Sequence, residues 1–169
     1  MSILLDADVI DFGIGFVNTS KQDVCGSNAT LIAGRYYTDY NDCWTAIGSA
    51  PPTPGGFNIT NDGNRNVTVC LRGPDKTSFF NSYSGGMPYD INWSGVNITG
   101  CAVANLLANV SFSSVNKTVC SDLKWENGID RIGVDVLLRV PSNLLPGAYS
   151  NGTIDFTAFQ TTTGVSCSG

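Results

Sequence analysis

Short segments in which apolar and polar residues alternate recur along this chain of 169 residues. Side chains of a strand alternate between two faces, so this period of two predicts strands with one buried face. Turn-forming residues separate the segments, as in NDGN at 61–64, SGG at 84–86 and PG at 146–147. No segment sustains helical periodicity beyond two turns. The predicted strands lie near 28–37, 56–61, 65–71, 89–98, 104–115, 132–140 and 148–160.

The segment VDVLLRV shows the alternation most clearly. Four aliphatic residues are expected to point into the core: Val134, Val136, Leu138 and Val140. The three residues between them are expected to point outward: Asp135, Leu137 and Arg139. Strands at this spacing with one apolar face predict a β-sandwich, in which two sheets bury their inner faces against each other. The length fits a single domain.

Asparagine occurs in the glycosylation sequon N-x-[ST] far more often than composition predicts. Ser and Thr make up 31 of 169 residues, so about 3 of the 16 asparagines would lie in sequons by chance. Asn58, Asn92, Asn97 and Asn109 fall between apolar neighbours, and Asn66 alternates with Val67 and Val69, so all five are in the outward phase of their predicted strands. We therefore expect glycosylation rather than a Ser/Thr/Asn-rich surface that forms sequons by accident. The nine candidate acceptors are Asn18, Asn28, Asn58, Asn66, Asn92, Asn97, Asn109, Asn116 and Asn151.

Six cysteines without a C-x-x-C pair, in a chain without histidine, favour disulfides over zinc and hence an oxidising, extracellular location. Six cysteines allow fifteen connectivities. We favour three pairs: Cys25 with Cys43, Cys101 with Cys120 across a hairpin, and Cys70 with Cys167, which would tie the C-terminal tail to a central strand.

Residues 38–56, TDYNDCWTAIGSAPPTPGG, are expected to form an insertion pinned by the first of these disulfides. Four aromatic residues lie in this insertion or just before it. They would form either a sugar-binding platform or a satellite cluster packed under the loop, and we favour the cluster. They are Tyr36, Tyr37, Tyr40 and Trp44. Asp39, Asn41 and Asp42 offer oxygen ligands for calcium, but without a calcium-loop pattern we favour a solvated turn and expect no metal.

Charge and motifs argue against several function classes. Only 14% of residues are charged and the net charge is -5, so no basic patch is expected to bind nucleic acid. The apolar runs are far shorter than the roughly 20 residues of a membrane span, so we expect no membrane insertion. Without histidine, a nucleophile elbow or a phosphate loop, we expect no enzymatic activity and no cofactor. An enzyme without these groups would need paired carboxylates. The nearest candidates are Asp6, Asp8 and Asp11, but acidic residues so placed are more typical of a strand edge that is kept soluble.

The N-terminal stretch SILLDADVIDFGIGFV changes phase in its middle. Its apolar residues occupy odd positions from Ile3 to Val9 and even positions from Ile10 to Phe16. One interpretation is a β-bulge within a single edge strand. The other is two strands with different partners, the first of which lies outside the core of its own subunit.

Three stretches resemble extracellular immunoglobulin-like domains of prokaryotes: VIDFG, FNITNDGNRNVTV and VDVLLRVPSNLLPGAYSNGTIDFTA. A glycosylated domain of this layout also resembles subunits of archaeal surface filaments, the thread and bundling-pilus proteins related to the biofilm fibre protein TasA. The resemblance implies an immunoglobulin-like or jelly-roll-like β-sandwich over 10–169 and a donor strand over 1–9 that inserts into the next subunit. The six cysteines depart from that group's pattern.

With this mechanism, four side chains of the donor strand would fill the neighbouring groove: Ile3, Leu5, Ala7 and Val9. Four others would fill the subunit's own core: Ile10, Phe12, Ile14 and Phe16. The sequence thus predicts a structural subunit of a glycosylated cell-surface filament, a homopolymer serving adhesion, biofilm cohesion or cell contact. The alternative is a monomeric cell-surface or surface-layer module that binds carbohydrate through the four aromatic residues of the insertion.

Overall fold

The computed structural model consists almost entirely of strands and turns, which confirms the predicted all-β class. It describes residues 2–6, 9–20, 25–34, 42–48, 54–102, 106–147, 149, 153–161 and 167. The strands are β1 (Leu4–Leu5), β2 (Gly15–Val17), β3 (Asn28–Ala33), β4 (Trp44–Ala46), β5 (Phe57–Thr60), β6 (Val67–Arg72), β7 (Asp90–Asn97), β8 (Val110–Ser111), β9 (Lys117–Leu123), β10 (Arg131–Pro141) and β11 (Asp155–Gln160), and one helical turn, α2, spans Lys76–Phe79.

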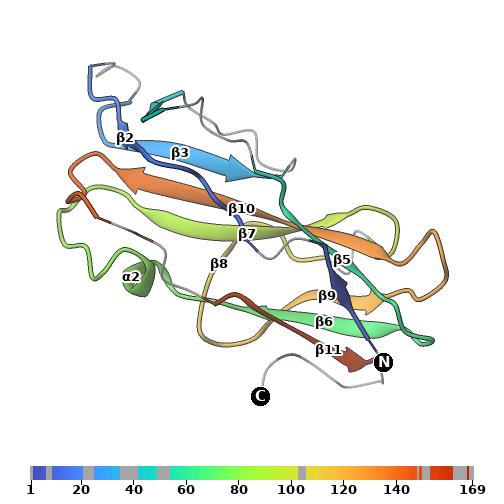
Figure 1. The fold of residues 1–169 in the computed structure, drawn as a ribbon. Coiled ribbons are helices and arrows are strands. Elements are labelled where there is room, and N and C mark those ends of the chain that lie inside the picture. Colours follow the sequence, from blue (N-terminus) through green and yellow to red (C-terminus); the bar gives the residue numbers. More distant parts are fainter. Residues whose placement is uncertain are drawn as a thin grey trace.

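Strand β10 organises the larger of the sheets. It pairs antiparallel with β7 along one side, and with β5 and then β3 along the other. The six-stranded sheet has the order β1-β5-β10-β7-β8, with β3 also paired to β10. A three-stranded sheet, β11-β6-β9, forms a second layer (Figure 1). Strands β2 and β4 form a separate two-stranded ribbon.

One apolar core lies between the two main sheets. Trp93 of β7 and Ile132 of β10 are fully buried on the side of the larger sheet, and Val69 of β6 and Leu123 of β9 on the side of the smaller one. At one edge, the rings of Phe57 and Phe156 meet edge to face at 5.3 Å and connect β5 to β11. Burial of this apolar surface is the main force that holds the layers together.

The predicted outward face of β10 is largely covered. The inward predictions hold, and Asp135 and Leu137, which alternate with these residues and lie outside the core cluster, are buried as well, so the outward face is not open to solvent there. A Cβ atom on Gly34 or Gly56 would come within 2.4 Å of the Asp135 carboxylate, so the backbone on each side of the insertion lies directly over this side chain. Arg139 remains partly exposed and pairs with Asp90 at 2.7 Å.

Three other predictions of strands need correction. Strand β9 was not predicted, because β-bulges in its pairing with β6 break the alternation on which the prediction relied. Of the predicted strand at 104–115 the structure describes 106–115, and this part contains only β8 and an isolated bridge from Leu106 to Cys120. The predicted insertion at 38–56 contains a strand, β4. Within the described residues no helix is long and apolar enough to cross a membrane.

The disulfides are the three pairs favoured from the sequence: Cys25–Cys43, Cys70–Cys167 and Cys101–Cys120. The last differs from its prediction in place, because it joins the segment after β7 of the larger sheet to β9 of the smaller sheet rather than crossing a hairpin. Three disulfides in one domain indicate an oxidising, extracellular or secreted environment.

Replacing Cys70 and Cys167 together by alanine is expected to lower the free energy of unfolding more than replacing Cys25 and Cys43 together. The first pair is separated by 97 residues and the second by 18. In the chain-entropy model such links contribute roughly 5 and roughly 3 kcal/mol. All four side chains are buried, so the cavities left behind are similar. Urea unfolding of both double variants provides the test, and an equal or smaller loss for the Cys70–Cys167 pair would contradict it.

Candidate functional site

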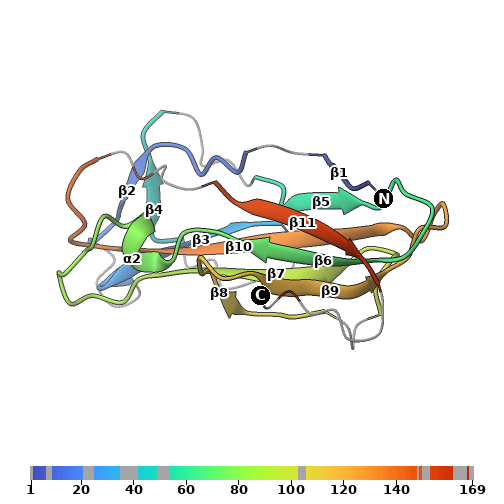
Figure 2. The same cartoon turned by 90° about the horizontal axis from the view of Figure 1, so that it is seen from below.

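The N-terminal stretch forms two strands with different partners. Leu4 and Leu5 of β1 pair with Thr60 and Ile59 of β5, and the Asp6 N–H donates to the carbonyl of Asn58 at 3.0 Å. Strand β2 pairs with β4 instead. Figure 2 shows β1 beside β5 towards one end of the molecule and β2 towards the other. The interpretation as a single bulged strand therefore does not hold.

The apolar side chains of this stretch are only partly covered. Ile3, Ile10 and Phe12 pack against the core, whereas Leu4, Leu5 and Val9 are exposed. Among the predicted donor residues, Ala7 lies outside the described part of the chain. The prediction that these residues fill a groove in a neighbouring subunit stays a prediction.

Ile14 and Phe16 do not fill the core, contrary to expectation, because β2 leaves the main sheets to pair with β4. Both side chains are exposed. The Ile47 N–H donates to the Ile14 carbonyl at 2.8 Å, which places these two residues opposite each other, and Ile47 is exposed too. Ile14, Phe16 and Ile47 thus form an apolar patch on the β2–β4 ribbon, at a distance from β1 along the molecule (Figure 2).

Every described sequon asparagine reaches the surface. Asn58, Asn97 and Asn109 are exposed, and Asn151 lies outside the described residues. The others are partly exposed: Asn18, Asn28, Asn66, Asn92 and Asn116. Asn18 follows β2 of the two-stranded ribbon, and the other described sequon asparagines lie on or beside strands of the two main sheets.

Asn61, which is not in a sequon, is buried, unlike the described sequon asparagines. Its amide nitrogen donates to the carbonyls of Arg65, Leu123 and Lys124 at 2.9, 3.3 and 3.0 Å. Its amide oxygen accepts from the Gly63 N–H at 3.1 Å. One side chain thus ties the β5–β6 turn to the segment that follows β9.

The sequon residue Asn66 belongs to a polar group next to this junction. Its amide nitrogen donates to Asp122 Oδ1 at 2.9 Å, and Lys124 Nζ donates to Asp122 Oδ2 at 2.6 Å. The hydrogen bond to Asp122, reinforced by its charge, raises the pKa of Lys124 above the usual 10.5. A raised lysine pKa stabilises the fold below pH 10.5, and the effect is lost as the pH rises through the pKa of the folded state. The group is intact at neutral pH.

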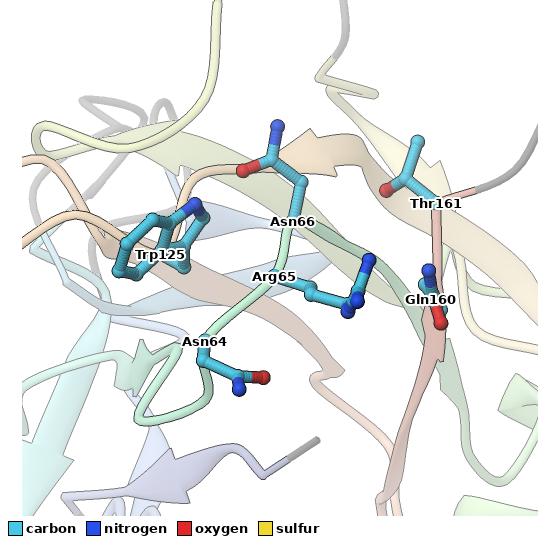
Figure 3. Close-up of a pocket in the computed structure, with 6 residues that line it drawn as sticks. All are labelled: Asn64, Arg65, Asn66, Trp125, Gln160 and Thr161. Carbon is cyan, nitrogen blue, oxygen red and sulfur yellow. The ribbon is translucent and has the colours of Figure 1, made fainter.

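An open depression of about 390 Å³ lies at the same end of the molecule (Figure 3). In the figure Trp125 stands on one side, Gln160 and Thr161 on the other, and the side chain of Arg65 extends towards Gln160. The lining comes from three segments: the β5–β6 connection, the β9–β10 connection and the end of β11. The residues are Asn64, Arg65, Asn66, Trp125, Gln160 and Thr161. Sequence reasoning considered only Asn66, although a tryptophan in the polar turn KWENG was an available signal.

The other residues considered from the sequence do not form a described site. Tyr36, Tyr37, Asp39, Tyr40, Asn41 and Asp8 lie outside the described residues. Trp44 packs against Gly15, where a Cβ atom would lie 2.5 Å from its ring. Asp6 and Asp11 are exposed, and Asp11 Oδ1 accepts from the Gly13 N–H at 2.7 Å. No group of three metal-ligating residues occurs in the part of the chain that the structure describes.

Comparisons with protein-family models, curated proteins and solved structures find no match for this chain. The functional argument therefore rests on its own residues.

Substitution of Asn61 by alanine is expected to lower the free energy of unfolding by about 1–3 kcal/mol, because it leaves buried carbonyls without a donor. Asn61→Asp should be at least as destabilising, since a carboxylate would face carbonyl oxygens. Asn127→Ala, at an exposed asparagine of the β9–β10 connection, is the matched control and should be neutral. Denaturant unfolding measures all three, and a neutral Asn61→Ala would refute the structural role.

Glycosylation is expected at most of the nine sequons in protein from its native host, and first of all at the exposed Asn58, Asn97 and Asn109. Intact-mass analysis should then exceed the 17.9 kDa of the bare chain, and glycopeptide mapping should locate the sugars. A bare mass would contradict the prediction. Removal of the glycans should reduce solubility, because few charges remain to solvate the surface.

Proposed function

We propose that the protein is a structural subunit of an extracellular, glycosylated filament, assembled head to tail by donation of the N-terminal strand. The observation that carries this proposal is the incomplete fit of the segment to its own domain. Among the described residues, β1 forms two residue pairs with β5 and one further backbone hydrogen bond from Asp6, and Leu4, Leu5 and Val9 stay exposed. An aliphatic segment so weakly held gains more from a second surface that covers it.

The contacts of β1 suggest where the neighbour would accept the segment. A segment exchanged between identical subunits can make the same contacts in trans that it makes in its own subunit. The acceptor would then be the β5 edge, whose Thr60 and Ile59 supply main-chain partners. Strand addition of this kind combines backbone hydrogen bonds with apolar contacts for alternate side chains. In this proposal the two main sheets form an immunoglobulin-like β-sandwich.

The apolar patch of Ile14, Phe16 and Ile47 supports a directional assembly. It lies on the β2–β4 ribbon, away from β1, so contacts at the two places involve different surfaces of the subunit (Figure 2). A contact between unlike surfaces produces an open filament unless its rotation closes a ring.

The sequons support an extracellular assembly with solvated sides. All the described sequons except that of Asn18 lie on or beside strands of the two main sheets, while charged residues make up only 14% of the chain. Glycans at these positions would keep the filament's sides hydrated and would direct association to the ends. A monomeric carbohydrate-binding module that uses the insertion has less support, because Trp44 of its proposed platform packs against Gly15.

A chain that begins at Ile10 is expected to remain monomeric, because it lacks the donated strand. Addition of a peptide of residues 1–9 should raise its melting temperature by occupying the vacant β5 edge. Negative-stain microscopy and thermal unfolding are the measurements. Filaments formed by the shortened chain, or a folded monomer that does not respond to the peptide, would overturn the mechanism.

Point variants separate donation from general surface hydrophobicity. Val9→Asp is expected to block filament formation, because it places a charge in a buried junction. Leu145→Asp is the matched control: Val9 is 72% exposed and Leu145 is 77% exposed in the free subunit, and Leu145 lies far along the chain in the connection after β10. Equal assembly of the two variants in light-scattering assays would refute the assignment of Val9.

A further inference from the structure

We propose that the depression bounded by Trp125, Arg65 and Gln160 binds a saccharide that carries a carboxylate. This site is separate from the strand β1 on which the filament proposal depends, and it would give the subunit a recognition function in addition to a structural one. Its volume of about 390 Å³ falls within the range of small-molecule sites.

Trp125 supplies the apolar surface of the site. Trp125 is 44% exposed. It belongs to a short polar turn, and its immediate neighbours in sequence, Lys124 and Glu126, are charged. A flat indole in an open depression suits the C–H face of a sugar ring, and its N–H remains available to a hydroxyl group. The other two tryptophans of the chain, Trp44 and Trp93, have buried indole nitrogens and do not offer such a surface.

Polar side chains line the depression opposite the indole. The amides of Asn64 and Gln160 both donate and accept, as the hydroxyl groups of a sugar require. Arg65 has no side-chain hydrogen bond or ion pair to another residue within the described part of the chain, and the nearby Asp122 is already engaged by Lys124 and Asn66. A guanidinium group presents a planar fork that matches a carboxylate, so Arg65 favours an acidic saccharide over a neutral one.

The site is organised before any ligand arrives. The buried amide of Asn61 holds the backbone at Arg65 and at Leu123 and Lys124, and so fixes both segments that carry the lining. The Thr161 N–H donates to the Asn66 carbonyl at 3.0 Å and attaches the end of β11 to the same frame. Fixed side-chain anchors reduce the entropy lost on binding.

The saccharide can come from two sources, because the sequon residue Asn66 is part of the lining. One source is a glycan attached to Asn66 itself, which rests on the glycosylation proposed above. The other is a free or neighbouring polysaccharide. Both would present a sugar ring to Trp125 and an acidic group to Arg65.

The first experiment uses the full chain produced in a bacterial periplasm, where disulfides form and these glycans are absent. Trigalacturonate should bind and quench tryptophan fluorescence, and maltotriose should bind at least about tenfold more weakly. Trp125→Ala should reduce the affinity by about tenfold or more. Ile129→Ala is the matched control, since Ile129 is 42% exposed in the same β9–β10 connection and does not line the depression. Arg65→Gln should remove the preference for the acidic sugar while maltotriose binding persists.

The second experiment uses glycosylated protein from the native host. If the attached glycan occupies the site, Trp125 should be protected from oxidation by N-bromosuccinimide, and Thr68→Val, which removes the Asn66 sequon without changing a lining residue, should abolish the protection and restore binding of trigalacturonate. Binding to the bare chain alone would identify an external saccharide as the source. The inference is overturned if the bare chain does not bind and the native protein shows no protection, or if Ile129→Ala weakens binding as much as Trp125→Ala. Filament assembly, measured separately by microscopy, does not depend on either result.

Discussion

Strand β10 determines the layout of the molecule because three other strands pair with it directly. Its first half is bonded to β5, its second half to β3, and nearly its whole length to β7. Both of its faces are covered, one by the core and the other by the chain on each side of the insertion, which lies over Asp135. The β5 edge that receives β1 is therefore attached to the most thoroughly buried strand, so a contact at that edge is made on a rigid support.

The two proposed interaction sites, the saccharide depression and the N-terminal segment, differ in how firmly the rest of the fold holds them. The saccharide depression is built on connections that Asn61 ties together through buried hydrogen bonds, and such a satisfied polar junction favours one conformation. The N-terminal stretch is held by two residue pairs in β1, three in β2 and the packing of Ile10 and Phe12 against the core, while Val9 and Ile14 stay exposed. A weakly held segment is suited to exchange between subunits, and a fixed surface is suited to recognition.

The described surface has little charge to direct association. The ion pairs Arg72–Asp155 and Arg139–Asp90 connect neighbouring strands within the sheets, at 2.8 and 2.7 Å. Such pairs contribute little to stability at exposed positions. Apolar contacts, rather than ion pairs, would therefore drive the association of subunits in the proposed filament.

The sequence by itself determined the all-β class, most strand positions, and the outward phase of the asparagines in the strands, because these depend on local alternation along the chain. It also pointed to the three disulfide pairs. Tertiary structure alone decided that Asp135 is buried, since Gly34 and Gly56, which lie over it, are distant in sequence. It likewise decided that Ile14 and Phe16 face solvent in a ribbon with β4, and that Trp125 meets Arg65 and Gln160 in one depression. A periodic pattern shows which face of a strand is apolar, but contacts between distant segments determine what covers that face.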